Sequence, residues 1–326
     1  MSSPGESSIP QRRVAPGGPR LSLLGITVIP PPVPGAGDRS AVDRLRRVRS
    51  AGVSTFDVAG SPEPRQSERL LRAAFPDPDP DLVVIVGRRL EDLVRQEEGP
   101  APPPDSSRGV TERLRHSLED SNRRLAPNHV GIVEWVDPEL PPTLDWGRVT
   151  HGLGDGSPPW LGRRWTGGDA PIPVERGDRS TPLLLSGALS LLDFQLVPSL
   201  ESRVREGPLT FLARDPFAGG RLDGTRAAGS AVERGPWAGP IRLRDLEVEF
   251  GPVLRLAHLT EHRRRTMAQA AILYVAHWPW VGSVLAPLPT SDRLEEVVGA
   301  FRTPPLSEED LRRVNRTNGT HRSSDR

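Results

Sequence analysis

The feature that most constrains the fold is a regular alternation of short apolar runs with longer amphipathic runs. The run at 82–87, LVVIVG, is continuously apolar, as expected of a strand buried on both faces. In an amphipathic run, the spacing of Ala41, Leu45 and Val48 places these side chains on one face of a helix. Repeated strand–helix units of this kind predict a parallel sheet joined by right-handed crossovers.

The same alternation continues along the chain. The predicted strands occupy 21–29, 53–59, 82–87, 129–136, 183–189, 209–213 and 281–287. The predicted helices after the first occupy 66–74, 111–124, 200–206, 252–264, 267–276, 292–301 and 306–314. A count of about eight strands indicates a closed (β/α)8 TIM barrel, which a chain of 326 residues can form as one domain.

Segments outside this alternation set the domain boundaries. We predict a disordered leader at 1–19, a barrel at 20–314 and a disordered tail at 315–326. The leader has no hydrophobic region typical of a secretory signal, and no apolar run reaches the roughly 20 residues that cross a bilayer. We therefore expect a cytoplasmic protein. We expect irregular loops over the C-terminal face of the barrel. The segment 155–182 is rich in Pro and Gly, which predicts that it is irregular and either functional or mobile, with its place relative to the barrel mouth left open.

The composition excludes several classes of chemistry. The chain has no cysteine, which rules out disulfides and thiolate nucleophiles. Its 43 basic residues are all arginine, and 42 acidic residues balance them to a net charge of +1. Such a balance provides no basic field for nucleic acid or membrane lipid. The replacement of lysine by arginine throughout is typical of a GC-rich bacterial genome, and the histidines show no metal-ligand spacing.

Four passages, in the correct order, resemble the aldo-keto reductase family. They are GVSTFDVAGSPEPRQSERLLRAAF, VTERLRHSLEDSNRRLAPNHVGIVEWVD, LTFLARDPFAGGRLDG and SVLAPLPTSDRLEEVVGAF. The resemblance covers residues 20–314. It implies a TIM barrel with its site at the C-terminal ends of the strands, and NADPH-dependent carbonyl reduction where the family's working residues are kept.

Most of the working residues that the resemblance implies are replaced in this chain. The family's aspartate corresponds to Asp57, but its tyrosine, lysine and histidine fall at Pro62, Arg88 and Val136. Proline has no O–H to donate, arginine stays protonated with a different shape, and valine cannot polarise a carbonyl. The single tyrosine, Tyr274, lies in an apolar helical run, which favours a packing role.

The strand ends also suggest an ion pair. Asp57 and Arg88 are predicted to end adjacent strands, where a bidentate pair is chemically natural. The pair is either structural, or Arg88 binds an anionic group while Asp57 orients that group or acts as a base. Glu134 is a further carboxylate near a strand end.

The positions that would hold a cofactor are partly replaced. The resemblance implies that Arg293 lies near a 2′-phosphate and Glu296 near an adenine. Leu189 takes the place of a tyrosine that stacks on the nicotinamide. We favour no cofactor, with NADPH as the alternative.

Three further residues are candidates for substrate binding. Trp160 and Trp165 lie in the segment 155–182, where they would form an apolar platform over the barrel mouth or anchor the segment to the body. His151, at a predicted strand end, is the best-placed histidine for chemistry, against an ordinary role in a turn.

Three functions remain open. The first is a non-redox enzyme that cyclises, eliminates or isomerises a small metabolite in a bacterial pathway, such as one of secondary metabolism. The second is a pseudoenzyme with a degenerate active site, which binds a small ligand or a partner protein. The third is a divergent NADPH-dependent oxidoreductase.

Overall fold

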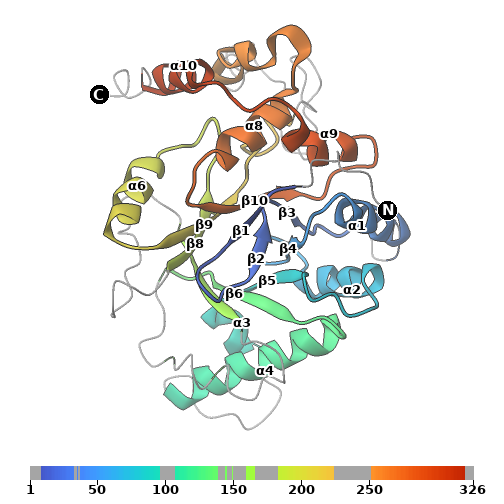
Figure 1. The fold of residues 1–326 in the computed structure, drawn as a ribbon. Coiled ribbons are helices and arrows are strands. Elements are labelled where there is room, and N and C mark those ends of the chain that lie inside the picture. The colour runs from blue at the N-terminus through green and yellow to red at the C-terminus, as the bar shows by residue number, and fades with distance from the viewer. Residues whose placement is uncertain are drawn as a thin grey trace, which may run out of the picture.

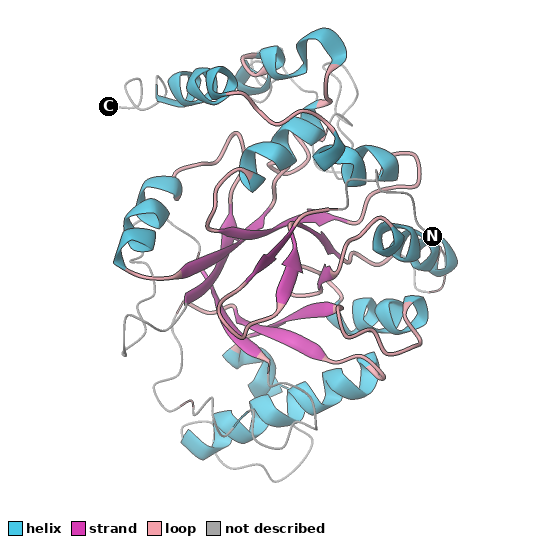
Figure 2. Ribbon diagram, in the orientation of Figure 1, coloured by secondary structure: helices cyan, strands magenta, loops and turns pink. Residues whose placement is uncertain are grey.

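The protein folds into a closed barrel of eight parallel strands. A computed structural model describes residues 9–32, 35, 37–95, 107–138, 144, 149, 159–165, 183–223 and 251–319. The barrel order is β10-β3-β4-β5-β6-β7-β8-β9. Figures 1 and 2 show the strands at the centre of the molecule. The strands are β3 (Leu24–Thr27), β4 (Thr55–Asp57), β5 (Val83–Arg88), β6 (Val130–Trp135), β7 (Trp160–Arg164), β8 (Leu183–Ala188), β9 (Leu209–Arg214) and β10 (Val281–Pro287). The predicted (β/α)8 class is confirmed.

Helices surround the barrel, as Figure 2 shows. They are α1 (Asp38–Ser50), α2 (Pro64–Ala74), α3 (Leu90–Arg95), α4 (Ser107–Leu125), α6 (Val197–Glu206), α8 (Met267–Ala276), α9 (Leu294–Val298) and α10 (Glu308–Gly319), with 3-10 helices at Ala257–Arg263 and Gly299–Arg302. The face of α1 predicted from the spacing is correct, because Ala41, Leu45 and Val48 are fully buried. The last helix, α10, runs past the tail boundary predicted at residue 314.

The strands separate two apolar layers. Side chains alternate along each strand, so one set points into the barrel and the other toward the helices. The inner layer contains Val83, Ile85, Ile132, Leu184, Leu212 and Leu285. The outer layer is larger and packs the strands against the helices, with Phe56, Phe211 and Trp135 among its bulkiest members.

A short antiparallel hairpin closes the N-terminal end of the barrel. Its strands are β1 (Gln11–Arg13) and β2 (Arg20–Ser22). Val14 and Ala15 complete the inner apolar layer, and Thr210 Oγ1 donates to the Val14 carbonyl at 2.6 Å. The boundary predicted at residue 20 therefore falls inside this hairpin. Residues 9–19 are ordered because they cover apolar side chains that the barrel would otherwise expose.

The segment 155–182, predicted to be irregular, contains β7, a barrel strand that the sequence analysis did not predict. Within it, β7 pairs in parallel with β6 and with β8. The strand is short, and its composition, WLGRR, lacks the apolar run that marked the others. Neighbouring strands supply its hydrogen bonds and thereby define it. The prediction of an irregular segment is wrong for these five residues.

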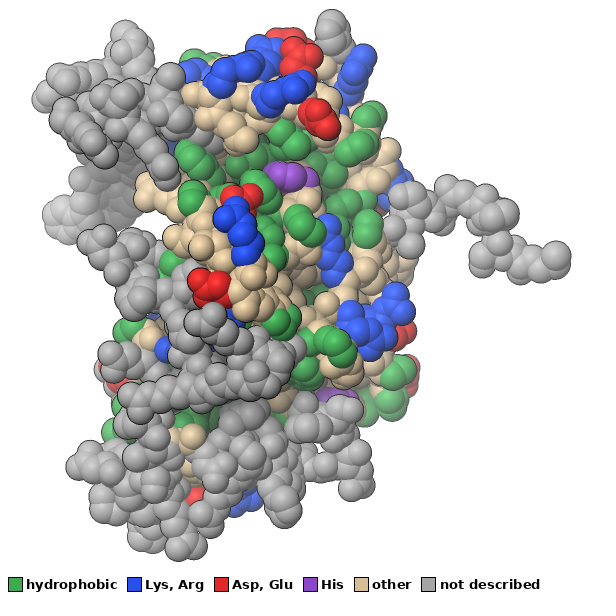
Figure 3. All heavy atoms as spheres, turned by 60° about the vertical axis from the view of Figure 1, so that its left-hand side comes forward, with side chains coloured by type: hydrophobic (Ala, Val, Ile, Leu, Met, Phe, Trp, Pro, Cys, Tyr) green, Lys and Arg blue, Asp and Glu red, His purple; other side chains and the backbone are tan. Residues whose placement is uncertain are grey.

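In the described ranges, no helix is long and apolar enough to cross a membrane. Figure 3 shows basic, acidic and apolar side chains interspersed over the described part of one face. This mixture matches the nearly neutral net charge of the sequence.

Candidate functional site at the barrel mouth

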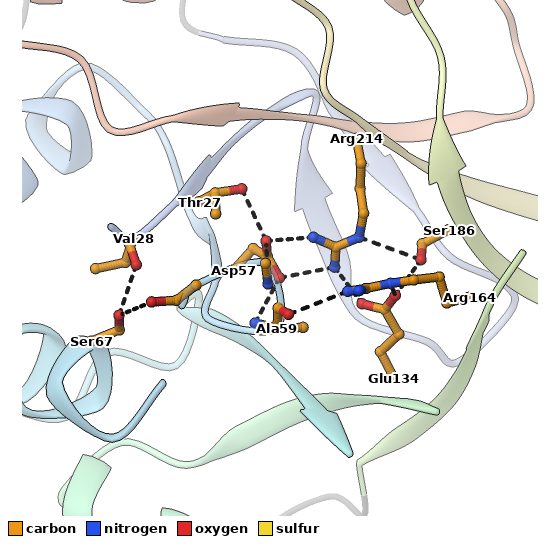
Figure 4. A network of polar contacts seen from close by, with 11 residues as sticks. Thr27, Val28, Asp57, Ala59, Ser67, Glu134, Arg164, Ser186 and Arg214 are labelled. Carbon is orange, nitrogen blue, oxygen red and sulfur yellow. Dashed lines mark hydrogen bonds and ion pairs between the residues drawn. The ribbon is translucent and has the colours of Figure 1, made fainter. Parts of the chain in front are cut away.

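A layer of polar side chains lies above the inner apolar layer, at the C-terminal ends of the strands. On the strands, these side chains lie on the same face as the inner apolar residues, so they point into the barrel and converge (Figure 4). They are Thr27, Asp57, Glu134, Arg164, Ser186 and Arg214. They come from β3, β4, β6, β7, β8 and β9.

Asp57 is bound on both carboxylate oxygens. Arg214 donates to it in a bidentate pair, Nη1 to Oδ2 at 2.7 Å and Nη2 to Oδ1 at 3.0 Å. Thr27 Oγ1 donates to Oδ2 at 2.9 Å. The backbone N–H of Ala59 donates to Oδ1 at 3.0 Å, and that of Gly60 to Oδ2 at 3.3 Å. The carboxylate is fully buried, so these donors replace its water.

Glu134 is held in the same way. Arg164 Nε donates to its Oε1 at 2.6 Å, Ser186 Oγ also donates to Oε1, and Arg214 Nη2 donates to Oε2. Burial alone would raise the pKa of Glu134, but attraction to Arg214 and then to Arg164 outweighs it and places that pKa below its ordinary value. Glu134 is therefore ionised at neutral pH.

Arg214 joins the two carboxylates across the barrel. Burial would lower the pKa of Arg214, yet Asp57 and then Glu134 raise it above its ordinary value. We call the four charged residues the mouth network: Asp57, Glu134, Arg164 and Arg214. Because each carboxylate oxygen already accepts a hydrogen bond, neither acid is arranged to take a proton from a substrate.

Arg88 does not meet Asp57, so the predicted ion pair is wrong. In β5 the inward positions are Val83, Ile85 and Gly87, and Arg88 consequently points outward toward α4. Its Nη1 donates to the Gly87 carbonyl at 2.7 Å. Its Nη2 donates to the Ser117 carbonyl at 3.1 Å and to Ser121 Oγ at 2.5 Å.

A second polar cluster surrounds Arg88. Ser121 Oγ donates to Glu68 Oε1 at 2.7 Å, and Arg124 Nε donates to Glu68 Oε2. Ser121 thus separates the guanidinium of Arg88 from the nearest carboxylate. Burial lowers the pKa of Arg88 to about 10, an effect that Glu68 opposes and Arg124 reinforces.

A cavity of about 560 Å³ opens beside this cluster, between the ends of β5 and β6 and the starts of α2 and α3. Pro62, Arg88 and Val136 all line it. These are the three positions at which the sequence resemblance places the family's tyrosine, lysine and histidine. The lining also includes Ala59 and Gly87, and a Cβ atom added to Gly87 would lie 3.1 Å from Ala59 Cβ and 3.3 Å from Val136 Cγ2. Ala59, Gly87 and Val136 therefore form a closely packed apolar part of the lining, which we call the floor.

The predicted aromatic platform does not form. Trp160 starts β7 and packs with Val14 and Ala15 at the opposite, N-terminal end of the barrel. Trp165 follows β7, points outward and is 5% exposed in the outer apolar layer. Both tryptophans anchor the segment, as the alternative interpretation held. His151 lies outside the described residues.

The predicted cofactor residues pair with each other. Arg293 Nε forms an ion pair with Glu296 Oε2, and Arg293 Nη2 donates to the Asp223 carbonyl. Leu189 is fully buried in the outer layer. Tyr274 is buried in α8, as its helical context predicted, and burial raises its pKa. A hydroxyl with a raised pKa is a weaker acid, so the buried Tyr274 does not serve as a proton donor at the mouth.

No family model matches the chain, and no curated protein matches it. Solved structures do. A glycerol dehydrogenase from Gluconobacter oxydans is 14% identical, with a TM-score of 0.67 and 93% of each chain covered. An aldo-keto reductase from Bacillus halodurans is 16% identical, with a TM-score of 0.63 and coverage of 95% of this chain and 96% of that one. A Bombyx mori aldo-keto reductase in complex with NADP is 14% identical, with a TM-score of 0.60, covering 95% and 93%.

The chain has the aldo-keto reductase fold. At these identities the likeness concerns the fold alone, and it agrees with the resemblance seen in the sequence.

The sequence interpretation missed Arg214, Arg164 and Ser186 as members of the site. Arg214 directly follows the apolar run 209–213, and alternation through Leu212 would have placed it inward. Arg164 was hidden because its strand was not recognised. Glu134 was noted near a strand end, but its partners come from strands distant in sequence.

Proposed function

We propose that this protein does not reduce carbonyls with NADPH, and that it binds a small metabolite in the cavity beside the barrel mouth. The observation that carries the proposal is the chemistry at the aligned positions. Pro62, Arg88 and Val136 line the cavity without a phenol, an ammonium or an imidazole. The aspartate that completes the family's set, Asp57, is engaged by Arg214.

The residues present do not fit a nicotinamide cofactor held as the family resemblance implies. Arg293 is neutralised by Glu296, which leaves it a weak site for a phosphate. After β9, the Gly219 N–H donates to both carboxylate oxygens of Asp215 at 2.8 and 3.0 Å. The Gly219 N–H is therefore already bound to a carboxylate, and the negative charge of Asp215 would repel an anionic ligand at this position.

Within this proposal, ligand binding without turnover is the function that the geometry supports best. The acids of the mouth network are buried and fully hydrogen bonded, which suits a structural role better than acid–base catalysis. Such a protein would act as a pseudoenzyme that presents a ligand, or a ligand-dependent surface, to a partner.

A non-redox enzyme is the second candidate. It is favoured by Glu63 and Asp92, which line the same cavity. In the described part of the chain no hydrogen bond to either carboxylate is seen, so either acid is free to move a proton in an elimination or isomerisation.

The test measures cofactor binding and ligand binding separately. NADPH fluorescence should show no saturation up to about millimolar cofactor, and a panel of aldehydes and ketones should not be reduced. Arg293→Ala is the control, because a signal that this variant leaves unchanged is not binding at the cofactor position. Reduction of a carbonyl at about 1 s⁻¹ or faster would overturn the proposal.

For the ligand, the purified protein is incubated with a bacterial metabolite extract, washed and denatured, and the released compounds are identified by mass spectrometry. We expect a retained compound that Val136→Trp releases, because the larger side chain fills the cavity. Equal retention by both proteins would place the ligand elsewhere and contradict the assignment of the cavity.

A further inference from the structure

The wall of the cavity carries more positive than negative charge. Its net charge is +1, from four arginines and three carboxylates: Arg65, Arg88, Arg89 and Arg124 against Glu63, Glu68 and Asp92. Glu68 and Arg124 neutralise each other in an ion pair, which leaves three arginines against two carboxylates. The charge that remains at this wall therefore favours an anion.

Arg88 is the most constrained of these cations. It is 7% exposed, and the three donor contacts it makes all go to neutral acceptors. Its Nε has no hydrogen-bond partner among the described residues. Burying a cation that has no directly bonded carboxylate is unfavourable in free energy, because the protein contacts do not compensate for the lost hydration. A negative group in the adjacent cavity would offset part of that cost.

The start of α2 adds a second, independent attraction. This helix of 11 residues begins at the cavity, where Glu63, Pro64 and Arg65 form part of the lining. No side chain caps its first turn, and that turn contains no acidic residue. Pro64 has no N–H, and the N–H groups of Gln66 and Ser67 donate to the Glu63 carbonyl. The N–H of Arg65 and the dipole of the helix N-terminus are what this end offers to an anion.

The floor restricts what the anion can be attached to. Ala59, Gly87 and Val136 present a small apolar surface next to the charged wall. A volume of about 560 Å³ lies in the range of metabolite sites. A fully hydrated inorganic ion would leave this floor uncovered.

We propose that the cavity binds a small organic acid, with its carboxylate at the wall formed by Arg88 and the start of α2 and its apolar part on the floor of Ala59 and Val136. This inference rests on the proposed function, because it specifies the ligand class of the same cavity.

The probes are isobutyrate, its neutral isostere isobutyramide, and inorganic phosphate. Binding of each probe to the full chain is measured by ligand-observed NMR. We expect isobutyrate to bind about tenfold or more tightly than isobutyramide, because a charge-assisted contact is lost in the amide. Phosphate should bind more weakly than isobutyrate, since it gains nothing from the apolar floor.

Two variants locate the site without disturbing the fold. Arg65→Gln should weaken isobutyrate about two- to fivefold, and Glu63→Gln should strengthen it by a similar factor, because both side chains are exposed at the cavity rim. The matched control is Arg69→Gln, an exposed arginine of the same helix that does not line the cavity. Arg88→Met should lose the preference for the acid over the amide, provided that circular dichroism shows it folded.

The outcomes separate the two proposals. Equal binding of isobutyrate and isobutyramide, abolished by Val136→Trp, would overturn the organic acid while leaving the cavity as a metabolite site. Tighter binding of phosphate than of isobutyrate would also overturn it, in favour of a phosphate site. An effect of Arg69→Gln equal to that of Arg65→Gln would place the anion away from the cavity and contradict the inference.

Discussion

At the scale of single residues, the partner of Asp57 is decided by which side chains point into the barrel. Arg88 follows it on the neighbouring strand but faces outward, whereas Arg214 faces inward from β9. An arginine is long enough to cross the mouth and reach two acids with a planar fork of donors. The result is a buried network that joins strands distant in sequence and whose removal leaves charges unpaired.

Glu134→Gln tests this network through pH. The pKa of Glu134 is lowered by folding, so its ionised form stabilises the protein above its ordinary pKa of 4.5, and that contribution is lost as pH falls through the lower folded-state pKa. At pH 7 the variant should be less stable by about 3–5 kcal/mol, because Arg164 and Arg214 lose a buried counter-ion.

The difference in urea-unfolding free energy between the wild type and Glu134→Gln should therefore narrow as the pH is lowered below 4.5. Glu295→Gln is the control, since this carboxylate is 69% exposed and pairs only at the surface. A difference for Glu134→Gln that stays constant from pH 7 to strongly acidic solution would show that its charge contributes nothing to folding.

At the scale of elements, β7 depends on its neighbours more than on its own sequence. The Trp165 N–H donates to the Ser186 carbonyl at 2.7 Å, which extends the pairing with β8 past the last strand residue. This close approach requires Gly187. A Cβ atom added there would lie 2.5 Å from the Trp165 carbonyl oxygen, a backbone atom that cannot move without breaking the pairing.

Gly187→Ala should consequently destabilise the protein by about 1–3 kcal/mol, as overpacking does, measured by urea unfolding. The matched control is Gly251→Ala, in a helical turn where the added atom would lie no closer than 3.7 Å to the end of the Arg255 side chain. There, alanine should be neutral or stabilising by up to about 1 kcal/mol. Equal effects at both positions would mean that the approach of Trp165 does not require glycine.

At the scale of the whole molecule, the N-terminal hairpin is hydrogen bonded to the segment that joins α8 to the last barrel strand, β10. Arg12 Nη1 donates to the carbonyls of Trp278 at 2.6 Å and of Val281 at 2.5 Å. Its Nη2 donates to the Ala276 carbonyl at 3.0 Å. These three carbonyls lie at the end of α8 and the start of β10, so the hairpin braces the point where the barrel closes.

Arg12→Ala should cost about 1–3 kcal/mol, because buried carbonyls lose their donor. Arg13→Ala serves as the control and should change stability little, because among the described residues the Arg13 side chain donates only to the Gly18 carbonyl within the hairpin. Thermal unfolding of the two variants compares them directly. If Arg13→Ala were the more damaging, the brace would lie within the hairpin rather than between the hairpin and β10.

The sequence by itself determined the barrel and the place of its acids. Periodic apolar positions such as Ala41, Leu45 and Val48 depend only on local geometry, and the run 82–87 is a strand in any context that buries both faces. The position of Asp57 at a strand end also follows from local spacing, as does the absence of a tyrosine or a lysine beside it.

Tertiary structure decided which groups meet. β7 exists because β6 and β8 supply its hydrogen bonds. The hairpin is ordered because its apolar residues pack on the inner layer at the N-terminal end of the barrel. Arg214 reaches Asp57 across 157 residues of sequence, while Arg88, on the adjacent strand, faces the opposite way. Local pattern fixes which residues form a strand, but only closure of the barrel fixes which of its side chains converge, because convergence depends on the register of every strand around the ring.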